Sequence, residues 1–412
     1  MYSSVLEALM KKRAMLVANS ASMIDHFNRD NIAILQSMQY EITVTANFRD
    51  GNSSSSERVQ AFRRELNEQH IDVLDLPIPR KVTQLGRMLK SVFALKKYLK
   101  KNPCDIIHTQ TPFGGVVGRL AAKKARKSGQ SKVIYFVHGF HFYKGAKSRK
   151  SALYYMIEKH LSRYTDCLIT LNQEDYTAGK VHFRHPNIRY VPGIGVNTDA
   201  IRNMQVDEAD KRAGLGLPSG KPVILNVSEL IPRKNIAASI EAFSKMENKN
   251  CVLVICGKGQ ERDKLLALCE TLAVTDRVYF LGYRTDILEI YRLADIFLFT
   301  SFQEGLPVGV MQAMAAGLPV IASDIRGNRD LLGQSEGTHS ADYLVDVHDT
   351  QAFADKLDSL LSHPETRHLL GEENVCRCRK YFDIAIVHEQ MQAIYRELKE
   401  QLDSEQNETE RG

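Results

Sequence analysis

The sequence predicts two doubly wound α/β domains joined by a short hinge. Short runs rich in Val, Ile and Leu alternate with amphipathic stretches of helical length, which is typical of a parallel sheet covered on both faces. Closely spaced Pro and Gly at 191–197 interrupt this alternation, and a second alternating set follows. A chain of 412 residues is long enough for two domains. Because ligands of such sheets bind at the carboxyl ends of the strands, we expect an interdomain cleft to hold the site.

The first domain is predicted to span residues 1–195 and the second residues 196–382. Each expected strand is a short apolar run followed by a loop and, in most cases, by a helical pattern. The strands expected in the first domain are 14–18, 42–46, 72–76, 105–109, 132–137, 167–171 and 189–191. Those expected in the second are 222–227, 251–256, 277–281, 296–300, 319–322 and 343–345.

The end of the chain divides into a helix and a tail. An amphipathic helix is predicted within 383–398, where apolar residues recur at helical spacing. The segment 399–412 is rich in Glu and has little apolar surface to bury, so we expect it to be disordered.

Composition favours a globular protein of a reducing compartment. Hydrophobic residues make up 43% and charged residues 25%, and no apolar run approaches the roughly 20 residues that span a bilayer. The basic start followed by the short apolar run 14–18 is interpreted as a first strand, not a signal peptide. The seven cysteines are odd in number and contain no Cys-x-x-Cys pair, which disfavours zinc and disulfides and favours the cytoplasm.

The net charge of +6 hides an excess of basic residues in the first half. Residues 1–195 carry 31 Lys and Arg against 15 acids, and 80–150 carry 18 against one acid, Asp105. Such an excess of positive charge creates an electrostatic field that suits a nucleic acid, a phosphate-bearing substrate or an anionic membrane surface. The alternative is that these charged side chains only face solvent.

The segment 304–317 holds the most informative motif. An acid, Glu304, lies on the turn Glu304-Gly305-Leu306-Pro307, and a short apolar helix with one polar side chain, Gln312, follows. A helix start presents free N–H groups to an anion or to sugar hydroxyls. Eight residues at ~1.5 Å each reach roughly 12 Å, which suits a nucleoside diphosphate sugar. The alternative is a Pro-punctuated turn before a core helix.

Other candidates in the second domain follow strands. Lys234, next to Arg233, is placed to neutralise a diphosphate, although an exposed loop base is the simpler interpretation. Gly257-Lys258-Gly259 is a weak phosphate motif and is better explained as a tight turn. At Gly282 and Tyr283 the backbone has room to approach a flat base, or forms an ordinary turn.

In the first domain, His138 ends a strand beside a glycine and is placed to face a cleft, although a lone histidine is more often structural. Asp25 and His26 lie after the first strand, either as an acid/base pair near an acceptor or as simple polar loop residues.

Taken in order, these motifs resemble the retaining glycosyltransferases of family 4, which use nucleotide sugars and have the GT-B architecture of two facing Rossmann-like domains. The resemblance spans nearly the whole chain and is strongest over 221–332. There the family pattern runs through the loop with Lys234, Gly257-Lys258-Gly259, Phe280-Leu281-Gly282 and Ala294-Asp295 to the motif at 304–317. The segments 137–146 and 324–329 look like those of bacterial capsule and exopolysaccharide enzymes.

The resemblance implies a role for each candidate. Glu304 would hold hydroxyls of the donor hexose, assisted by backbone groups of Gly305 and Leu306. Gln312 would contact the ribose, and Lys234, with Arg233, would neutralise the leaving diphosphate without a metal ion or other cofactor.

The remaining implied roles involve both domains. His138 would meet the donor sugar from the first domain, Gly282 and Tyr283 would border the base, and the last helix would cross back onto the first domain.

The chain departs from the family pattern at two positions and in one segment. Gln312 stands where a second Glu is usual, and Glu229 stands where many members have an Arg that binds phosphate. The segment 20–27 replaces a Gly-rich loop, so roles on the acceptor side, including those of Asp25 and His26, cannot be transferred from the family.

The function predicted is transfer of a hexose from a UDP-sugar to a saccharide acceptor linked to a polyprenyl diphosphate, in capsular or exopolysaccharide synthesis. We expect a cytoplasmic enzyme, peripheral on the inner face of the cell membrane, with no nucleic acid as partner. Lys144–Lys150, next to residues 153–157, are expected to meet the anionic membrane surface, and the alternative is that the apolar residues of 153–157 belong to the core. The alternatives are a sugar-nucleotide epimerase of the same architecture and a catalytically degenerate partner subunit.

Overall fold

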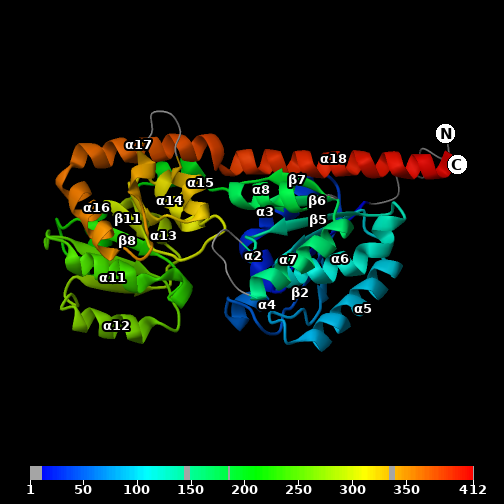
Figure 1. Cartoon of the computed structure of the whole chain (residues 1–412), viewed down its shortest axis with the longest axis horizontal. Helices are drawn as coiled ribbons and strands as arrows, with labels where there is room; N and C mark the ends of the chain where they lie inside the picture. Colours follow the sequence, from blue (N-terminus) through cyan, green and yellow to red (C-terminus); the bar gives the residue numbers. More distant parts are fainter. Residues whose placement is uncertain (1–11, 143–148, 184–185, 334–338, 412) are drawn as a thin grey trace. The chain divides into compact units, whose positions relative to one another are not determined.

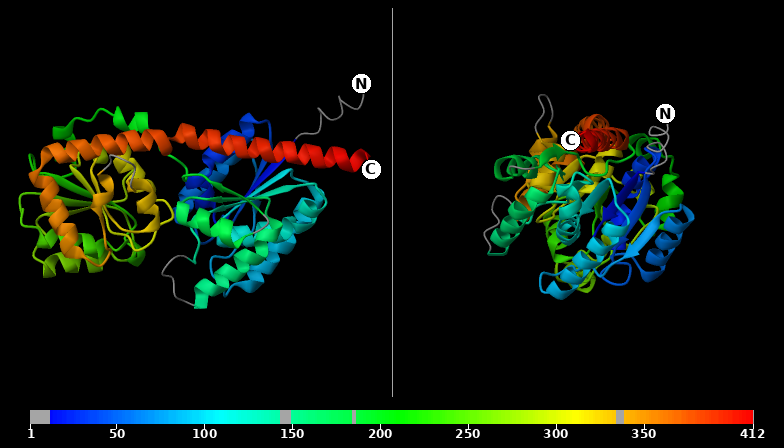
Figure 2. Two further views of the ribbon diagram at one scale, coloured as in Figure 1. Left: turned by 45° about the horizontal axis from the view of Figure 1, so that its top comes forward. Right: turned by 90° about the vertical axis from the view of Figure 1, so that its right-hand side faces the viewer.

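The computed structural model describes residues 12–142, 149–183, 186–333 and 339–411 (Figure 1). The chain forms two compact units, Met1–Ile194 with Val387–Gly412, and Gly195–Ile386. Each unit is a parallel sheet whose two faces are covered by helices, as Figure 2 shows. All thirteen predicted strands are present, with bounds that differ by at most two residues, so the predicted α/β class with two Rossmann-like sheets is confirmed.

The first unit holds a seven-stranded sheet in the order β3-β2-β1-β4-β5-β6-β7. Its strands are β1 (Arg13–Val17), β2 (Glu41–Ala46), β3 (Asp72–Asp75), β4 (Ile106–Gln110), β5 (Lys132–Val137), β6 (Cys167–Thr170) and β7 (Asn187–Tyr190). Its helices are α2 (Ala21–Phe27), α3 (Arg29–Ser37), α4 (Ser56–Glu68), α5 (Leu85–Lys101), α6 (Pro112–Lys127), α7 (Arg149–Leu161) and α8 (Gln173–His182), with the 3₁₀ helix η1 (Ser162–Tyr164).

Neighbouring residues of the central strand β4 identify the helices on the two faces of this sheet. Thr109 packs against α6, where a Cβ at Gly118 would meet its Cγ2 atom at 2.3 Å. His108 points to the opposite face, and its Nδ1 lies 2.7 Å from the hydroxyl of Tyr395 in α18 (Ile384–Arg411). Glycine at position 118 therefore allows α6 to pack directly on the sheet, with α18 on the other side.

Helix α18 corrects the prediction of a disordered tail. The helix continues to Arg411, and its residues from Val387 onward belong to the first unit. The apolar stripe continues past 398 to Leu402, which is buried. Glu405 pairs with Lys132 at 2.5 Å, and Asp403 lies 3.6 Å from Lys12. The prediction was wrong because it counted the acids of this segment but not the basic surface that they meet.

The second unit holds a six-stranded sheet in the order β10-β9-β8-β11-β12-β13. Its strands are β8 (Val223–Val227), β9 (Val252–Cys256), β10 (Val278–Gly282), β11 (Ile296–Phe299), β12 (Val320–Ser323) and β13 (Leu344–Val345). Its helices are α9 (Thr198–Arg202), α10 (Glu208–Gly214), α11 (Ile236–Lys245), α12 (Arg262–Thr271), α13 (Ile287–Arg292), α14 (Val308–Ala315), α15 (Arg326–Leu332), α16 (Thr350–Ser362) and α17 (Pro364–Tyr381), with the 3₁₀ helices η2 (Pro232–Lys234) and η3 (Ser340–Tyr343).

The core of the second unit lies between the sheet and the helices α11, α12 and α16. Strand residues such as Ile224 and Leu253 pack with Phe243 of α11 and Phe353 of α16, and all four side chains are buried. Apolar packing of this kind fixes the strand ends, and the loops that leave them carry the candidate site. Among the described residues, no helix has both the length and the apolar character that crossing a membrane requires.

Candidate active site

The predicted acid and the predicted lysine of the second unit are in direct contact. Oε1 of Glu304 accepts from Nζ of Lys234 at 2.8 Å and from Nη1 of Arg233 at 2.8 Å. The side chains of Glu304 and Lys234 are only 10% and 14% exposed, whereas that of Arg233 is 42% exposed. The tertiary structure therefore joins residues 70 positions apart into one charged cluster at the carboxyl ends of β8 and β11.

Lys234 is positioned by a tight turn after β8. The turn is the 3₁₀ helix η2, and Asn235 ends it in a left-handed conformation with φ 51° and ψ 42°. The carbonyl oxygen of Asn235 accepts from the hydroxyl of Thr300, which follows β11, at 2.8 Å. Phe302 N–H donates to the carbonyl of Arg233 at 3.0 Å. These bonds hold the loop with Lys234 against the loop with Glu304.

The turn that carries Glu304 is also supported by α15. A Cβ at Gly327 would meet the carbonyl oxygen of Gly305 at 2.5 Å, so only glycine allows this close approach. Arg326 Nε donates to the carbonyl of Glu304 at 3.2 Å. Arg326 and Gly327 were not among the predicted site residues. Their sequence signals are their place just after β12, at the same edge of the sheet, and the likeness of the segment 324–329 to bacterial capsule and exopolysaccharide enzymes.

Three buried polar atoms near these loops point to a polar ligand or to bound water. Within the described ranges, Ser228 Oγ, Ser301 Oγ and Asn328 Oδ1 have no hydrogen-bond partner. Ser228 and Ser301 follow β8 and β11, and Asn328 lies in α15. A buried polar atom without a partner is costly, so a ligand or water that supplies one is favoured here.

Glycines 257 and 259 are required by backbone contact, which agrees with the tight-turn interpretation. A Cβ at Gly257 would meet the carbonyl oxygen of Ser228 at 1.7 Å, and one at Gly259 would meet that of Leu230 at 2.1 Å. The loop after β9 therefore packs directly on the loop after β8, which leads to Lys234.

The remaining second-domain candidates lie at the same edge or on α14. Gly282 ends β10 with φ +69°, and Tyr283 is 66% exposed, with Lys258 Nζ 5.6 Å from its ring centroid. Leu306 is buried, and Gln312 is half-buried on α14. In the part of the chain that the structure describes, no hydrogen bond occupies the side-chain amide of Gln312.

His138 of the first unit is held in one tautomer by a buried amide. Its Nε2 lies 2.7 Å from Oε1 of Gln110, and because an amide oxygen only accepts, Nε2 carries the proton. Its ring stacks on Phe136, with centroids 5.4 Å apart. Burial lowers the pKa of His138 to about 4, so the ring is neutral at pH 7 and Nδ1 is an acceptor.

Gln110 connects His138 to the last helix. Asn28 Nδ2 donates to Gln110 Oε1 at 2.8 Å, and Gln110 Nε2 lies 3.3 Å from Nε2 of His108. The Nδ1–H of His108 then donates to Tyr395, whose hydroxyl donates to Asn31 at 3.1 Å. This network could not be predicted from the sequence, because its members are up to 364 residues apart.

Asp25 lies within a network of charged side chains. Its carboxylate is 5% exposed and accepts from Arg58 Nε and Nη2, both at 2.8 Å, and from Arg29. Both arginines also pair with Glu65. His26 is exposed, with Nε2 3.1 Å from Ser54 Oγ. These contacts give Asp25 a structural role, and an acceptor-side role for Asp25 and His26 stays a prediction.

Replacing Asp25 with Asn is expected to lower the free energy of unfolding by about 1–3 kcal/mol at pH 7, because two arginines lose a buried carboxylate. Burial pushes the pKa of Asp25 upward, but the hydrogen bonds from Arg58 and Arg29 outweigh it and hold the pKa below its ordinary value of 3.8. A lowered pKa stabilises the fold above about pH 4, and this contribution is lost as the pH falls through the folded-state pKa.

Urea unfolding of both proteins between pH 3 and pH 7 measures the effect. Glu65→Gln is the matched control with a smaller expected loss, because its side chain is 34% exposed. An Asp25→Asn protein as stable as the unchanged one at pH 7 would contradict the structural role.

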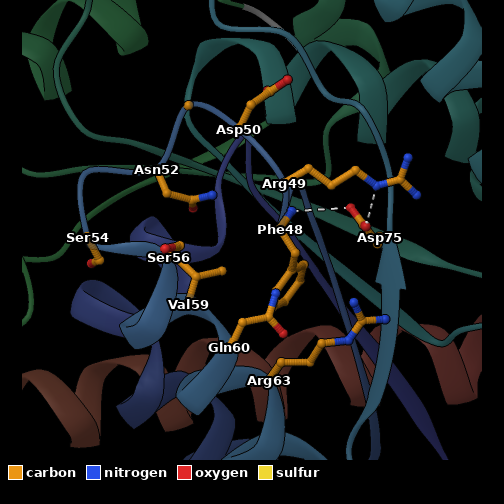
Figure 3. Close-up of a pocket in the computed structure, with 11 residues that line it drawn as sticks. Phe48, Arg49, Asp50, Asn52, Ser54, Ser56, Val59, Gln60, Arg63 and Asp75 are labelled. Carbon is orange, nitrogen blue, oxygen red and sulfur yellow. Dashed lines mark hydrogen bonds and ion pairs between the residues drawn. The ribbon is translucent and has the colours of Figure 1, made fainter.

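A polar cavity of about 500 Å³ lies where β2 and β3 end (Figure 3). Arg49 pairs with Asp75 at 2.8 Å on one wall, and Asp75 also accepts from the N–H of Phe48 at 3.2 Å. The other lining residues are Asp50, Gly51, Asn52, Ser54, Ser56, Val59, Gln60 and Arg63. This cavity could not be predicted from the sequence, because the Gly, Asn and Ser at 51–56 indicate a loop but not its shape.

Known proteins match this chain over most of its length. Residues 207–375 match the family model described as glycosyl transferases group 1, and residues 23–172 match the one described as glycosyl transferase 4-like. A protein of Bacillus subtilis named as a glycosyltransferase, EpsD, is 38% identical over 73% of this chain and 78% of its own length.

A second relative and a solved structure are similar over long stretches. The Escherichia coli enzyme named UDP-Gal:alpha-D-GlcNAc-diphosphoundecaprenol alpha-1,3-galactosyltransferase is 31% identical over 65% of this chain and 69% of its own length. The crystal structure of Anabaena HepE in complex with UDP-glucose aligns with 93% of this chain and 99% of its own, with a TM-score of 0.74 and 19% identity.

Proposed function

The chain belongs to family 4 of the glycosyltransferases, and from this membership we propose that it transfers a hexose from a UDP-sugar to a saccharide linked to a polyprenyl diphosphate. The observation that carries the proposal is the contact of Glu304 with Lys234 and Arg233 at the carboxyl ends of β8 and β11. The name of the Escherichia coli relative, which includes both UDP-Gal and a diphosphoundecaprenol-linked sugar, supports the donor and the acceptor class. HepE, with bound UDP-glucose, supports the donor class.

The proposed mechanism begins with an exchange of partners in the charged cluster. The donor diphosphate competes with Glu304 for Lys234 and Arg233, which draws the two cations toward the phosphates. The carboxylate that is released accepts hydrogen bonds from hexose hydroxyls. One cluster thus recognises both ends of the bond that breaks.

Charge develops as the bond to the leaving diphosphate breaks. Negative charge grows on the diphosphate, where Lys234, Arg233 and the N–H groups at the start of α14 stabilise it. We propose that these groups suffice without a metal ion and that the reaction proceeds with retention. The leaving phosphate oxygen then takes the proton of the acceptor hydroxyl as the new glycosidic bond forms.

Neutral His138 has a defined part in this scheme. Its Nε2–H is held by Gln110, so Nδ1 is left to accept a hydrogen bond from a donor-sugar hydroxyl. Tyr283, exposed beside Gly282, offers a surface for the base. The product class is capsular polysaccharide or exopolysaccharide, and the enzyme works peripherally at the inner face of the cell membrane.

Purified protein, incubated with a panel of nucleotide sugars and lipid-linked acceptors, tests the proposal. We expect consumption of a UDP-sugar with and without a chelator, and a product with retained anomeric configuration by NMR. A Glu304→Ala, Lys234→Ala protein is the control, and donor consumption no higher than that of the control would refute the transferase activity. An altered sugar nucleotide formed without acceptor would indicate an epimerase, and donor binding without turnover a degenerate subunit.

Replacing Gln312 with Glu is expected to lower the KM for the donor by about three- to tenfold with little change in kcat. A carboxylate makes hydrogen bonds with ribose hydroxyls that are roughly twice as strong as those of an amide. The half-buried side chain has no hydrogen-bond partner to lose among the described residues. Initial-rate kinetics measure the change, with Gln312→Ala as the control that raises KM. A donor KM that does not fall would argue against a ribose contact.

A further inference from the structure

Helix α5 presents an apolar stripe to solvent. Leu85, Leu89 and Phe93 are 56%, 53% and 67% exposed, and Val82, just before the helix, is 43% exposed. Residues four apart lie on one face of a helix, so the three helical side chains form a continuous row. Contiguous exposed apolar side chains on a globular protein mark a site of interaction.

The fold does not need this row for its core. The opposite face of α5 supplies the core contacts, with Leu95 and Leu99 buried against residues of α6 such as Val117 and Ala121. In Figure 1, α5 lies next to α6, and its other side faces no further helix among the described residues of the first unit. Among the described residues, the stripe is thus an unpartnered face of a helix that is already anchored.

Lysines surround the stripe. Exposed lysines lie beyond its end and beside it, at Lys90, Lys96, Lys97, Lys100 and Lys101. Within residues 12–142, 149–183, 186–333 and 339–411, no acidic side chain pairs with any of these five ammonium groups. The sequence from Arg80 to Cys104 contains no Asp or Glu. An apolar row flanked by unneutralised lysines is the pattern of a helix that lies in a membrane interface.

We propose that the outer face of α5 docks the first unit on an anionic lipid bilayer. Leu85, Leu89 and Phe93 enter the boundary between headgroups and acyl chains, and the lysines contact lipid phosphates. The proposal rests on the proposed function for its biological purpose, which is to reach a lipid-linked acceptor. It places membrane contact on α5 rather than on Lys144–Lys150, of which residues 144–148 lie outside the described residues.

The start of α5 also adjoins the polar cavity of Figure 3. Nη2 of Arg87, in the first turn of the helix, pairs with Asp50 of the cavity wall at 2.9 Å. Arg80 donates to the carbonyl of Gly51, another lining residue. Docking through α5 therefore brings this cavity close to the lipid surface, where the saccharide of a lipid-linked acceptor lies.

Sedimentation with vesicles of phosphatidylglycerol and phosphatidylcholine tests the docking surface. We expect the full chain to bind these vesicles and to bind pure phosphatidylcholine at least tenfold more weakly. A Leu85→Gln, Leu89→Gln, Phe93→Gln protein is expected to lose at least tenfold in affinity at both low and high salt. A Lys90→Gln, Lys96→Gln, Lys97→Gln protein is expected to lose roughly 100-fold at low salt, about fivefold for each lysine.

The matched control is Leu153→Gln, Met156→Gln on α7, whose side chains are 43% and 58% exposed and belong to the earlier predicted surface. It is expected to bind as the unchanged protein does. Loss of binding in the α7 protein but not in the α5 proteins would overturn the proposal. The proposal would also be overturned if the stripe only mediated self-association. In that case the unchanged protein would form a dimer and bind no vesicles, and the apolar α5 substitutions would dissociate the dimer.

Donor turnover separates this inference from the proposed function. The α5 proteins are expected to keep the unchanged rate with a water-soluble acceptor and to lose at least tenfold with the acceptor embedded in vesicles. Transfer by a protein that does not bind vesicles would refute the docking surface alone. Vesicle binding through α5 by a protein without any donor turnover would refute the proposed function and leave the docking surface standing.

Discussion

Replacing Glu304 with Gln is expected to lower kcat by about 10²- to 10³-fold while UDP binds as tightly as before, or more tightly. In the structure Glu304 holds Lys234 and Arg233, so under the proposed mechanism a nucleotide must first draw these cations away from the carboxylate. The amide removes that competition, which favours the binding of UDP. It also removes the charged acceptor for hexose hydroxyls, which slows transfer.

Calorimetric titration of UDP and initial-rate kinetics measure the two effects separately. A protein that lost both UDP binding and activity would point to a collapsed loop rather than to lost recognition of the sugar. Glu229→Gln, on the loop after β8, is the control, with less than a threefold effect expected on kcat. Full activity of Glu304→Gln would exclude the proposed hold on the donor hexose.

Replacing Lys234 with Ala is expected to lower kcat by about 10³-fold and to weaken UDP binding about tenfold. Its ammonium group is only 14% exposed, and a charge in a partly dehydrated site stabilises a leaving diphosphate more strongly than one in water. Both affinity and rate should fall, in contrast to the expected behaviour of Glu304→Gln.

Arg233→Ala is the matched control for Lys234→Ala. Arg233 contacts the same carboxylate oxygen but is 42% exposed and also donates to the carbonyl of Gln303 at 2.7 Å. We expect about a tenfold loss of kcat. In Lys234→Ala, Arg233 still neutralises Glu304, so thermal unfolding should change by only a few degrees. Equal effects of the two substitutions would indicate that the total charge, not the position of Lys234, matters.

The sequence was sufficient to predict the succession of strands along the chain and to identify the family. Strands buried on both faces need continuous apolar runs, and those runs are visible in the sequence without knowledge of their neighbours. Lys234 was identified because it follows such a run, and Glu304 because it lies on a turn that leads into a helix. The carboxyl ends of parallel strands meet at one edge, which is why two residues 70 positions apart could be expected in one site.

The contacts of Asp25 and of the tail could not be predicted in this way. The buried carboxylate of Asp25 depends on Arg58 and Glu65 of a different helix, and the helix from 399 to 411 depends on Lys132 and on the burial of Leu402. Each is an interaction between segments whose separation in sequence carries no information about their distance in space.

Helix α5 and His138 show most clearly the difference between what the sequence determines and what only tertiary packing decides. The sequence determined that the region of α5 is strongly basic and that His138 ends a strand. Only packing against α6 decided that Leu95 and Leu99 turn inward and leave Leu89 and Phe93 exposed. Likewise, only the meeting of β4 with β5 placed Gln110 at His138 and set its tautomer. Local patterns fix the type of each element, but which face is buried and which proton is held depend on partners that tertiary packing supplies.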